Sequence, residues 1–115
     1  GDLAYQNNKG VLFLLGRSDD MIVSGGENVY FIDLENVLLQ HDSISEVAVI
    51  GVNDQNYGKR LKVYVVMKKN YSFNKEEIFN WLKPKVARFQ MPVEIVCVPQ
   101  FTYISVGKIS KKHLG

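Results

Sequence analysis

The chain has 115 residues, of which 46% are hydrophobic and 23% are charged, a composition typical of one globular domain. No apolar stretch approaches the roughly 18 residues of a membrane span, and the N-terminus has neither the basic region nor the long apolar run of a signal peptide. The single cysteine, Cys97, excludes an internal disulfide, and its apolar neighbours predict a buried structural thiol in a cytoplasmic protein.

The net charge of +2 conceals an uneven division along the chain. Residues 1–57 contain two basic and nine acidic residues, a net charge of −7, whereas residues 58–115 contain twelve basic and three acidic residues, a net charge of +9. The basic half suits either a phosphorylated ligand or a solvated lysine-rich surface. No RNA-recognition signature accompanies its basic and aromatic residues, so we expect no nucleic-acid partner.

The first half of the chain predicts two hairpins and a helix. Strands are expected at residues 3–5 and 11–15, with a turn between them. A shorter strand at 20–23 leads into a turn at 24–28 and returns over 29–31. Residues 32–40 have the apolar spacing of a helix, on the face that carries Leu34, Val37, Leu38 and His41.

The second half predicts three strands and one main helix. Residues 44–52, 61–67 and 92–98 are strand-like, with a turn at 53–58. Asn74 has the position of a helix cap, with Glu77 three residues later, and Pro84 either interrupts that helix or starts a second turn. A loop is expected at 99–107 and a helix at 109–115. The order α-β-β-α-β predicts an α+β fold, a small three-stranded sheet with flanking helices preceded by β-hairpins.

Generic site motifs are incomplete in this sequence. Val106-Gly107-Lys108 is not a phosphate-binding P-loop, because Thr102 and Ile109 occupy positions that need Gly and Ser or Thr. His41 and His113 are far apart and lack cysteine partners, so no metal site is expected. The apolar setting of His41 favours a hydrogen-bonded histidine at the edge of the core over a catalytic base.

Four segments in register carry a family resemblance. They are residues 1–5, residues 10–22 with Gly16-Arg17-Ser18-Asp19-Asp20, residues 24–30 with Ser24-Gly25-Gly26-Glu27-Asn28, and residues 34–38. Residues 47–58 and 101–109 match the segments that follow. Together they resemble the superfamily of acyl-CoA synthetases, peptide-synthetase adenylation domains and luciferases, over essentially the whole chain.

The resemblance implies a two-step ligase reaction. A carboxylate attacks the α-phosphate of ATP to form an acyl-adenylate, and a thiol then displaces AMP. ATP, Mg²⁺ and coenzyme A are the implied cofactors, and a fatty or aromatic acid is the implied substrate. Residues 1–18 would end a large N-terminal adenylation domain and approach the hinge, and residues 19–115 would form the small C-terminal lid. This fragment, whose first residue is not Met, would be inactive without that N-terminal domain.

The resemblance also implies roles for individual residues. Asp2 and Arg17 would bind the ribose of the nucleotide, and Asp19 would be the hinge between the domains. Lys108 would be the catalytic lysine of adenylation, offsetting negative charge on the phosphoryl oxygens.

The acceptor thiol would reach the reaction centre past the loop after the hinge. Gly25 and Gly26 would line the pantetheine tunnel, and Tyr57 would stack on the adenine of coenzyme A. Many relatives that use coenzyme A have basic residues where this chain has Met91 and Val93. Two alternatives therefore stay open: an enzyme that loads the pantetheine of a carrier protein, and, in another class, a small RNA- or protein-binding module.

Overall fold

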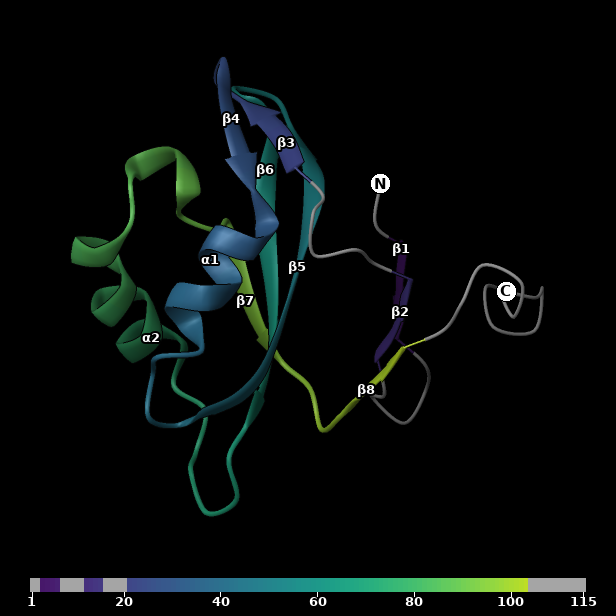
Figure 1. Cartoon of the computed structure of the whole chain (residues 1–115), viewed down its shortest axis with the longest axis vertical. Helices are drawn as coiled ribbons and strands as arrows, with labels where there is room; N and C mark the ends of the chain where they lie inside the picture. The colour runs from purple at the N-terminus through teal and green to yellow at the C-terminus, as the bar shows by residue number, and fades with distance from the viewer. Residues whose placement is uncertain (1–2, 7–11, 16–20, 104–115) are drawn as a thin grey trace.

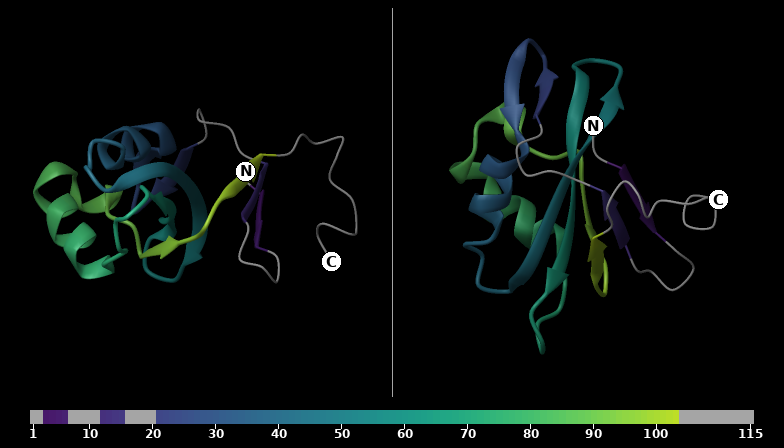
Figure 2. Two further views of the ribbon diagram at one scale, coloured as in Figure 1. Left: turned by 90° about the horizontal axis from the view of Figure 1, so that it is seen from below. Right: turned by 45° about the vertical axis from the view of Figure 1, so that its right-hand side comes forward.

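A computed structural model describes residues 3–6, 12–15 and 21–103. In this part of the chain, two α-helices cover one side of a three-stranded sheet, and a second small sheet lies on its other side (Figures 1 and 2). The predicted α+β class is confirmed. No helix within the described ranges is long and apolar enough to cross a membrane.

The central sheet has the strand order β5-β6-β7, formed by β5 (Ile44–Asp54), β6 (Gly58–Met67) and β7 (Glu94–Cys97). β5 and β6 form a long antiparallel hairpin that runs from the pair Ile44 and Met67 to the pair Asp54 and Gly58. β7 pairs with β6 in parallel, because the helical segment between them carries the chain back across the sheet. The three predicted strands are confirmed, although β5 and β6 continue further into the turn than expected.

The helices are α1 (Phe31–Leu38) and α2 (Lys75–Leu82), and their apolar faces pack on the central sheet (Figure 1). Leu34, Leu38, Ile78 and Leu82 are fully buried there. The predicted cap is confirmed, since the Asn74 side chain accepts a hydrogen bond of 3.0 Å from the Glu77 backbone N–H. Two short 3₁₀ turns follow α2: η1 (Lys83–Lys85), which contains Pro84, and η2 (Arg88–Gln90).

The second sheet has the order β1-β2-β8 and contains β1 (Leu3–Gln6), β2 (Leu12–Leu15) and β8 (Phe101–Tyr103). The expected loop at 99–107 is wrong at 101–103, because these residues pair in parallel with β2. Phe101 also packs against a second buried cluster, made of Ala48, Tyr64 and Val98. The helix expected at 109–115 lies outside the described residues.

The remaining hairpin, β3 (Met21–Ser24) and β4 (Glu27–Tyr30), packs against the upper part of the central sheet in Figure 1. Its inward side chains, Ile22 and Val29, join the main core. The approach is close at Gly51, where a Cβ atom would lie 2.6 Å from Cγ2 of Ile22. Glycine at position 51 therefore allows the hairpin to lie directly on β5.

Glu35 on α1 gives a prediction for the pH dependence of stability. Burial raises the pKa of its carboxyl above the ordinary value of 4.5, and a hydrogen bond from the Val49 backbone partly offsets the rise. The folded state therefore binds this proton more tightly than the unfolded state, so Glu35 contributes stability below pH 4.5 that is lost as pH rises through the raised pKa.

We expect Glu35→Gln to raise the free energy of unfolding at pH 7 by roughly 0.5 kcal/mol, a small gain because solvent screens a half-buried group. Urea denaturation from pH 3.5 to pH 7 measures this, and the gain should shrink toward the acid end. Glu46→Gln, at an exposed position on β5, is the control. A gain that does not change with pH would contradict the assignment.

Candidate functional site

The turn of the β3–β4 hairpin consists of Gly25 and Gly26, with φ values of +56° and +86°. Positive φ at both central residues is the requirement of a type I′ turn, which matches the twist of a two-residue hairpin. A turn is therefore confirmed within the expected range 24–28, but it is limited to Gly25 and Gly26, because Ser24 ends β3 and Glu27 begins β4. Glycine is favoured here because other residues adopt this conformation only with strain.

A second turn, between β5 and β6, presents Tyr57 to solvent. One carboxylate oxygen of Asp54 accepts hydrogen bonds from the backbone N–H groups of Asn56, at 3.0 Å, and Tyr57, at 2.9 Å. Gly58 then takes a φ of +81° and begins β6. The side chain of Tyr57 is left 41% exposed, which makes its ring available for contact with a ligand.

The two turns are joined to each other. The Gly25 backbone N–H donates a hydrogen bond of 2.9 Å to the Tyr57 carbonyl oxygen. A Cβ atom at Gly25 would lie 3.0 Å from Cδ1 of the Tyr57 ring, whereas one at Gly26 would meet nothing within 4 Å. The Tyr57 ring thus limits the width of the space beside Gly25.

The two turns form two walls of a pocket, and the segment from η2 to β7 forms the third wall. Gln90 stabilises its start by accepting a 2.7 Å hydrogen bond from the Ala87 N–H through its side-chain oxygen. The guanidinium of Arg60 donates a 3.2 Å hydrogen bond to the Met91 carbonyl oxygen, and the Val93 N–H donates one of 2.8 Å to Leu61. These contacts hold the segment against β6.

These three walls enclose a pocket of about 620 Å³. Arg60, Lys83 and Arg88 contribute positive charge, and Glu27 contributes the one negative charge among its lining residues. Tyr57 and Phe89 add two partly exposed aromatic rings. The other lining residues are Ser24, Gly25, Met91 and Pro92. Cations beside flat rings suit an anionic ligand that has a planar group.

Of the site residues expected from sequence, Gly25 and Tyr57 line the pocket, and Gly26 completes the turn beside it. Asp2, Arg17, Asp19 and Lys108 lie outside the described residues, so their predicted roles stay predictions. No motif in the sequence assigns Arg60, Lys83, Arg88 or Phe89 to the site, although all four line the pocket. A signal was present in the three basic residues and the aromatic Phe89 between 83 and 89, but nothing in it indicates which side chains face the glycine turn.

His41 has the structural role that its sequence setting predicts. It is 7% exposed, and its Nε2 lies 3.0 and 3.1 Å from the two carboxylate oxygens of Glu77. Its Nδ1 accepts a hydrogen bond from the Ser43 N–H, and its ring packs edge-on against Trp81. Among the described residues, no group of three or more His, Cys, Asp or Glu side chains is arranged to hold a metal ion.

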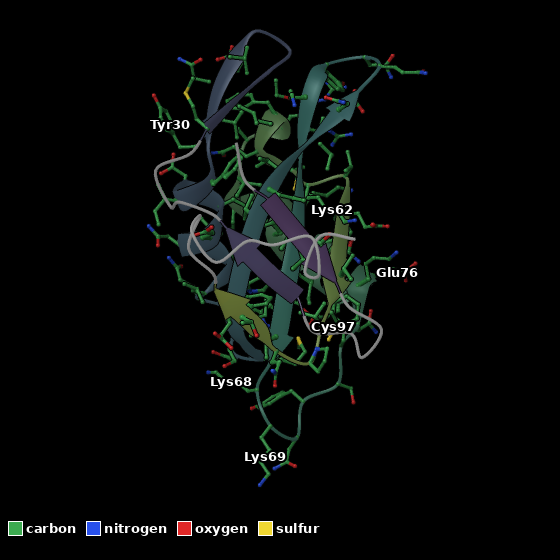
Figure 3. The ribbon with its side chains drawn as sticks, turned by 90° about the vertical axis from the view of Figure 1, so that its right-hand side faces the viewer. Tyr30, Lys62, Lys68, Lys69, Glu76 and Cys97 are labelled. Carbon is green, nitrogen blue, oxygen red and sulfur yellow. The ribbon has the colours of Figure 1, made fainter. Side chains whose placement is uncertain are left out.

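Cys97 corrects a prediction, because its side chain is exposed (Figure 3). The apolar run around Cys97 does form a strand. However, β7 is the edge strand of its sheet and ends at Cys97, so no neighbouring strand covers the thiol on that side. Nearby atoms still partly desolvate the thiol and raise its pKa, with a hydrogen bond involving the Met67 backbone acting in the opposite direction. The raised pKa lowers the reactive thiolate fraction.

The described basic residues do not gather in one place. Lys68 and Lys69 lie on the loop after β6, at the end of the domain opposite the two hairpin turns (Figure 3). Lys62 lies on β6 and pairs with Glu94 at 3.5 Å. The positive charge at the pocket is therefore a local feature rather than part of a continuous basic face.

Comparison with protein families identifies the domain to which most of the chain corresponds. A family model described as the AMP-binding enzyme C-terminal domain matches residues 33–108. Among curated proteins, the indoleacetate–CoA ligase of Aromatoleum aromaticum is 33% identical over 111 residues, which are 96% of this chain and 22% of that protein. The human mitochondrial medium-chain acyl-CoA ligase ACSF2 is 37% identical over 114 residues, 99% of this chain and 18% of the relative.

Solved structures show the same likeness. Apo MatB from Rhodopseudomonas palustris has a TM-score of 0.71 and 29% identity over 90% of this chain and 21% of its own. The o-succinylbenzoate CoA synthetase of Bacillus subtilis, in complex with an acyl-adenylate intermediate, has a TM-score of 0.64 and 36% identity over 86% of this chain and 20% of its own. The chain thus spans about a fifth of the length of the relatives that it matches.

Proposed function

The chain belongs to the AMP-binding enzyme C-terminal domain family, and from this membership we propose that it is the small C-terminal domain of an acyl-CoA ligase. The complete enzyme would use ATP, Mg²⁺ and coenzyme A to activate a fatty or aromatic carboxylic acid in the cytoplasm. Residues 1–18 would end the large N-terminal domain, and residues 19–115 would move against it about Asp19. Indoleacetate and medium-chain acids are the substrates named for two relatives, which supports this substrate class.

The observation that carries the proposal is the pocket beside the glycine turn. Gly25 lines the pocket without a side chain and Gly26 completes the turn beside it, and a pantetheine arm would reach the reaction centre past this turn. Tyr57 and Phe89 offer faces for the adenine, and Lys83 and Arg88 offer charge for the phosphates of coenzyme A. The contacts to substrate, Asp2 and Arg17 on the ribose and Lys108 on the phosphoryl group, are part of the same proposal.

Loading of a carrier protein is the second candidate, because Met91 and Val93 occupy positions where a basic residue would favour the nucleotide of coenzyme A. Val93 is 41% exposed, so this part of the surface is apolar. A carrier-protein pantetheine lacks the adenosine nucleotide and would need fewer cations. We favour coenzyme A because two exposed cations, Lys83 and Arg88, line the pocket at other positions.

An acceptor assay in the intact ligase tests the choice. We expect thioester formation with coenzyme A, and the double variant Lys83→Gln, Arg88→Gln should raise the KM for coenzyme A about tenfold or more, since two charge-assisted contacts are lost. The rate of acyl-adenylate formation, measured by pyrophosphate exchange, should not change. The double variant Lys68→Gln, Lys69→Gln, at the opposite end of the domain (Figure 3), is the matched loss of two positive charges.

Faster transfer to a pantetheinylated carrier protein than to coenzyme A would favour the second candidate. Absence of adenylation with any carboxylic acid, together with a salt-dependent mobility shift of RNA by the chain, would favour a nucleic-acid-binding module instead.

A further inference from the structure

Arg60 contacts two walls of the pocket at once. It lies on β6, three residues after Tyr57, and its side chain is half-buried. One terminal nitrogen donates the 3.2 Å hydrogen bond to the Met91 carbonyl oxygen. Its central carbon lies 5.4 Å from the centre of the Tyr57 ring, within the range of a cation–π contact.

These contacts extend to the β3–β4 turn through the backbone of Tyr57. Tyr57 accepts the hydrogen bond of the Gly25 N–H, and its ring borders the space beside that glycine. The guanidinium therefore connects the segment that contains Phe89 and Met91 to both hairpin turns. A planar group with several donors can make a directed hydrogen bond and a ring contact together, which the small ammonium of a lysine does less well.

We propose that Arg60 is a positioning residue for the acceptor thiol: it fixes the Tyr57 ring and the Met91 segment so that the channel past Gly25 keeps its width. This inference rests on the proposed function, in which coenzyme A enters that pocket. We assign Arg60 to positioning rather than to phosphate binding, because its side chain is half-buried and contacts both Met91 and Tyr57. Lys83 and Arg88 are exposed, so their charged groups are more accessible to a phosphate than that of Arg60.

The role has a kinetic signature that differs from that of a phosphate ligand. In the intact ligase, Arg60→Met should raise the KM for coenzyme A and for dephospho-coenzyme A by the same factor, about tenfold, the scale of one lost charge-assisted hydrogen bond. The adenylation step should keep its rate. Arg60→Lys should recover part of the loss, and Lys59→Met, at the exposed neighbouring position, should change neither KM.

A second measurement does not depend on activity. In the 115-residue chain, Arg60→Met should speed hydrogen exchange of the Gly25 amide about tenfold or more, because the Tyr57 carbonyl that it binds is held less firmly. Lys59→Met should leave that amide protected. Unchanged exchange in Arg60→Met would overturn the proposal.

Other kinetic outcomes would also overturn it. A rise in KM for coenzyme A alone would make Arg60 a ligand of the 3′-phosphate. An equal fall in adenylation and thioester formation, with a lower melting temperature, would make it a general support of the fold. If the unchanged ligase did not use coenzyme A at all, the proposed function would fail, and the exchange of the Gly25 amide would still decide the role of Arg60.

Discussion

Replacing Lys108 by alanine in the intact ligase should slow formation of the acyl-adenylate by about 100- to 1000-fold. Attack of the carboxylate on the α-phosphate increases the negative charge on the phosphoryl oxygens, and a positioned ammonium stabilises that charge. The expected loss corresponds to about 3–4 kcal/mol of transition-state stabilisation, by analogy with removal of one oxyanion donor. Thioester formation from supplied acyl-adenylate makes no such demand and should stay within about twofold.

Measuring the two half-reactions separately makes this result specific. Pyrophosphate exchange reports adenylation, and release of AMP from supplied acyl-adenylate and coenzyme A reports thioester formation. Lys111→Ala and Lys112→Ala are the controls, since both remove a lysine from the same basic segment. Equal loss of both steps in Lys108→Ala would reject the assigned role, as would equal effects of the three lysine replacements.

The parts of the fold that sequence predicts well are those set by local chemistry. The Asn74 cap needs only a side-chain oxygen and a backbone N–H three residues later, and both are visible in the sequence. The glycine turn is similar, because Gly25 and Gly26 are the residues that tolerate its positive φ values. In both cases the interaction lies within a few residues, so the pattern determines the structure.

The errors concern features that depend on distant partners. Residues 101–103 form β8 because β2, about ninety residues earlier, provides a partner, and no local pattern reports that pairing. Cys97 stands in a strand-like apolar run, but its exposure follows from the edge position of β7, which depends on sheet order. Helix α1 ends at Leu38 rather than residue 40, so His41 is held by Glu77 and Ser43 beyond the helix.

The candidate site divides in the same way. Gly25, Gly26 and Tyr57 were expected because they stand in register with the motifs of a family. Arg60 was missed because it is one of several cations in the run from Lys59 to Lys62, and only the folded chain shows its bond to Met91. A residue that connects segments distant in the sequence has no characteristic spacing to its partners, so a single sequence does not reveal it.

Replacing a glycine of the β3–β4 turn should have the opposite effect to replacing Lys108, because it should impair thioester formation and leave adenylation unchanged. In the intact ligase, Gly25→Ala should lower the rate of thioester formation by about tenfold or more, because the added methyl group enters the path of the thiol and small errors in its placement are costly. The new Cβ would lie 3.0 Å from the Tyr57 ring, so the ring must give by a few tenths of an ångström, and the methyl group narrows the path of the thiol. Adenylation should keep its rate, because the thiol takes no part in it.

Gly26→Ala separates the steric effect from backbone strain. Both glycines have positive φ, so alanine at either position adds strain of about 1–2 kcal/mol, seen as a lower melting temperature. A Cβ at Gly26, however, meets nothing within 4 Å, so the Tyr57 ring keeps its place. Gly26→Ala should therefore match Gly25→Ala in stability yet retain at least about tenfold more thioester activity. If the two variants lost the same thioester activity, strain in the turn would explain the loss, and the Tyr57 ring would have no role in admitting the thiol.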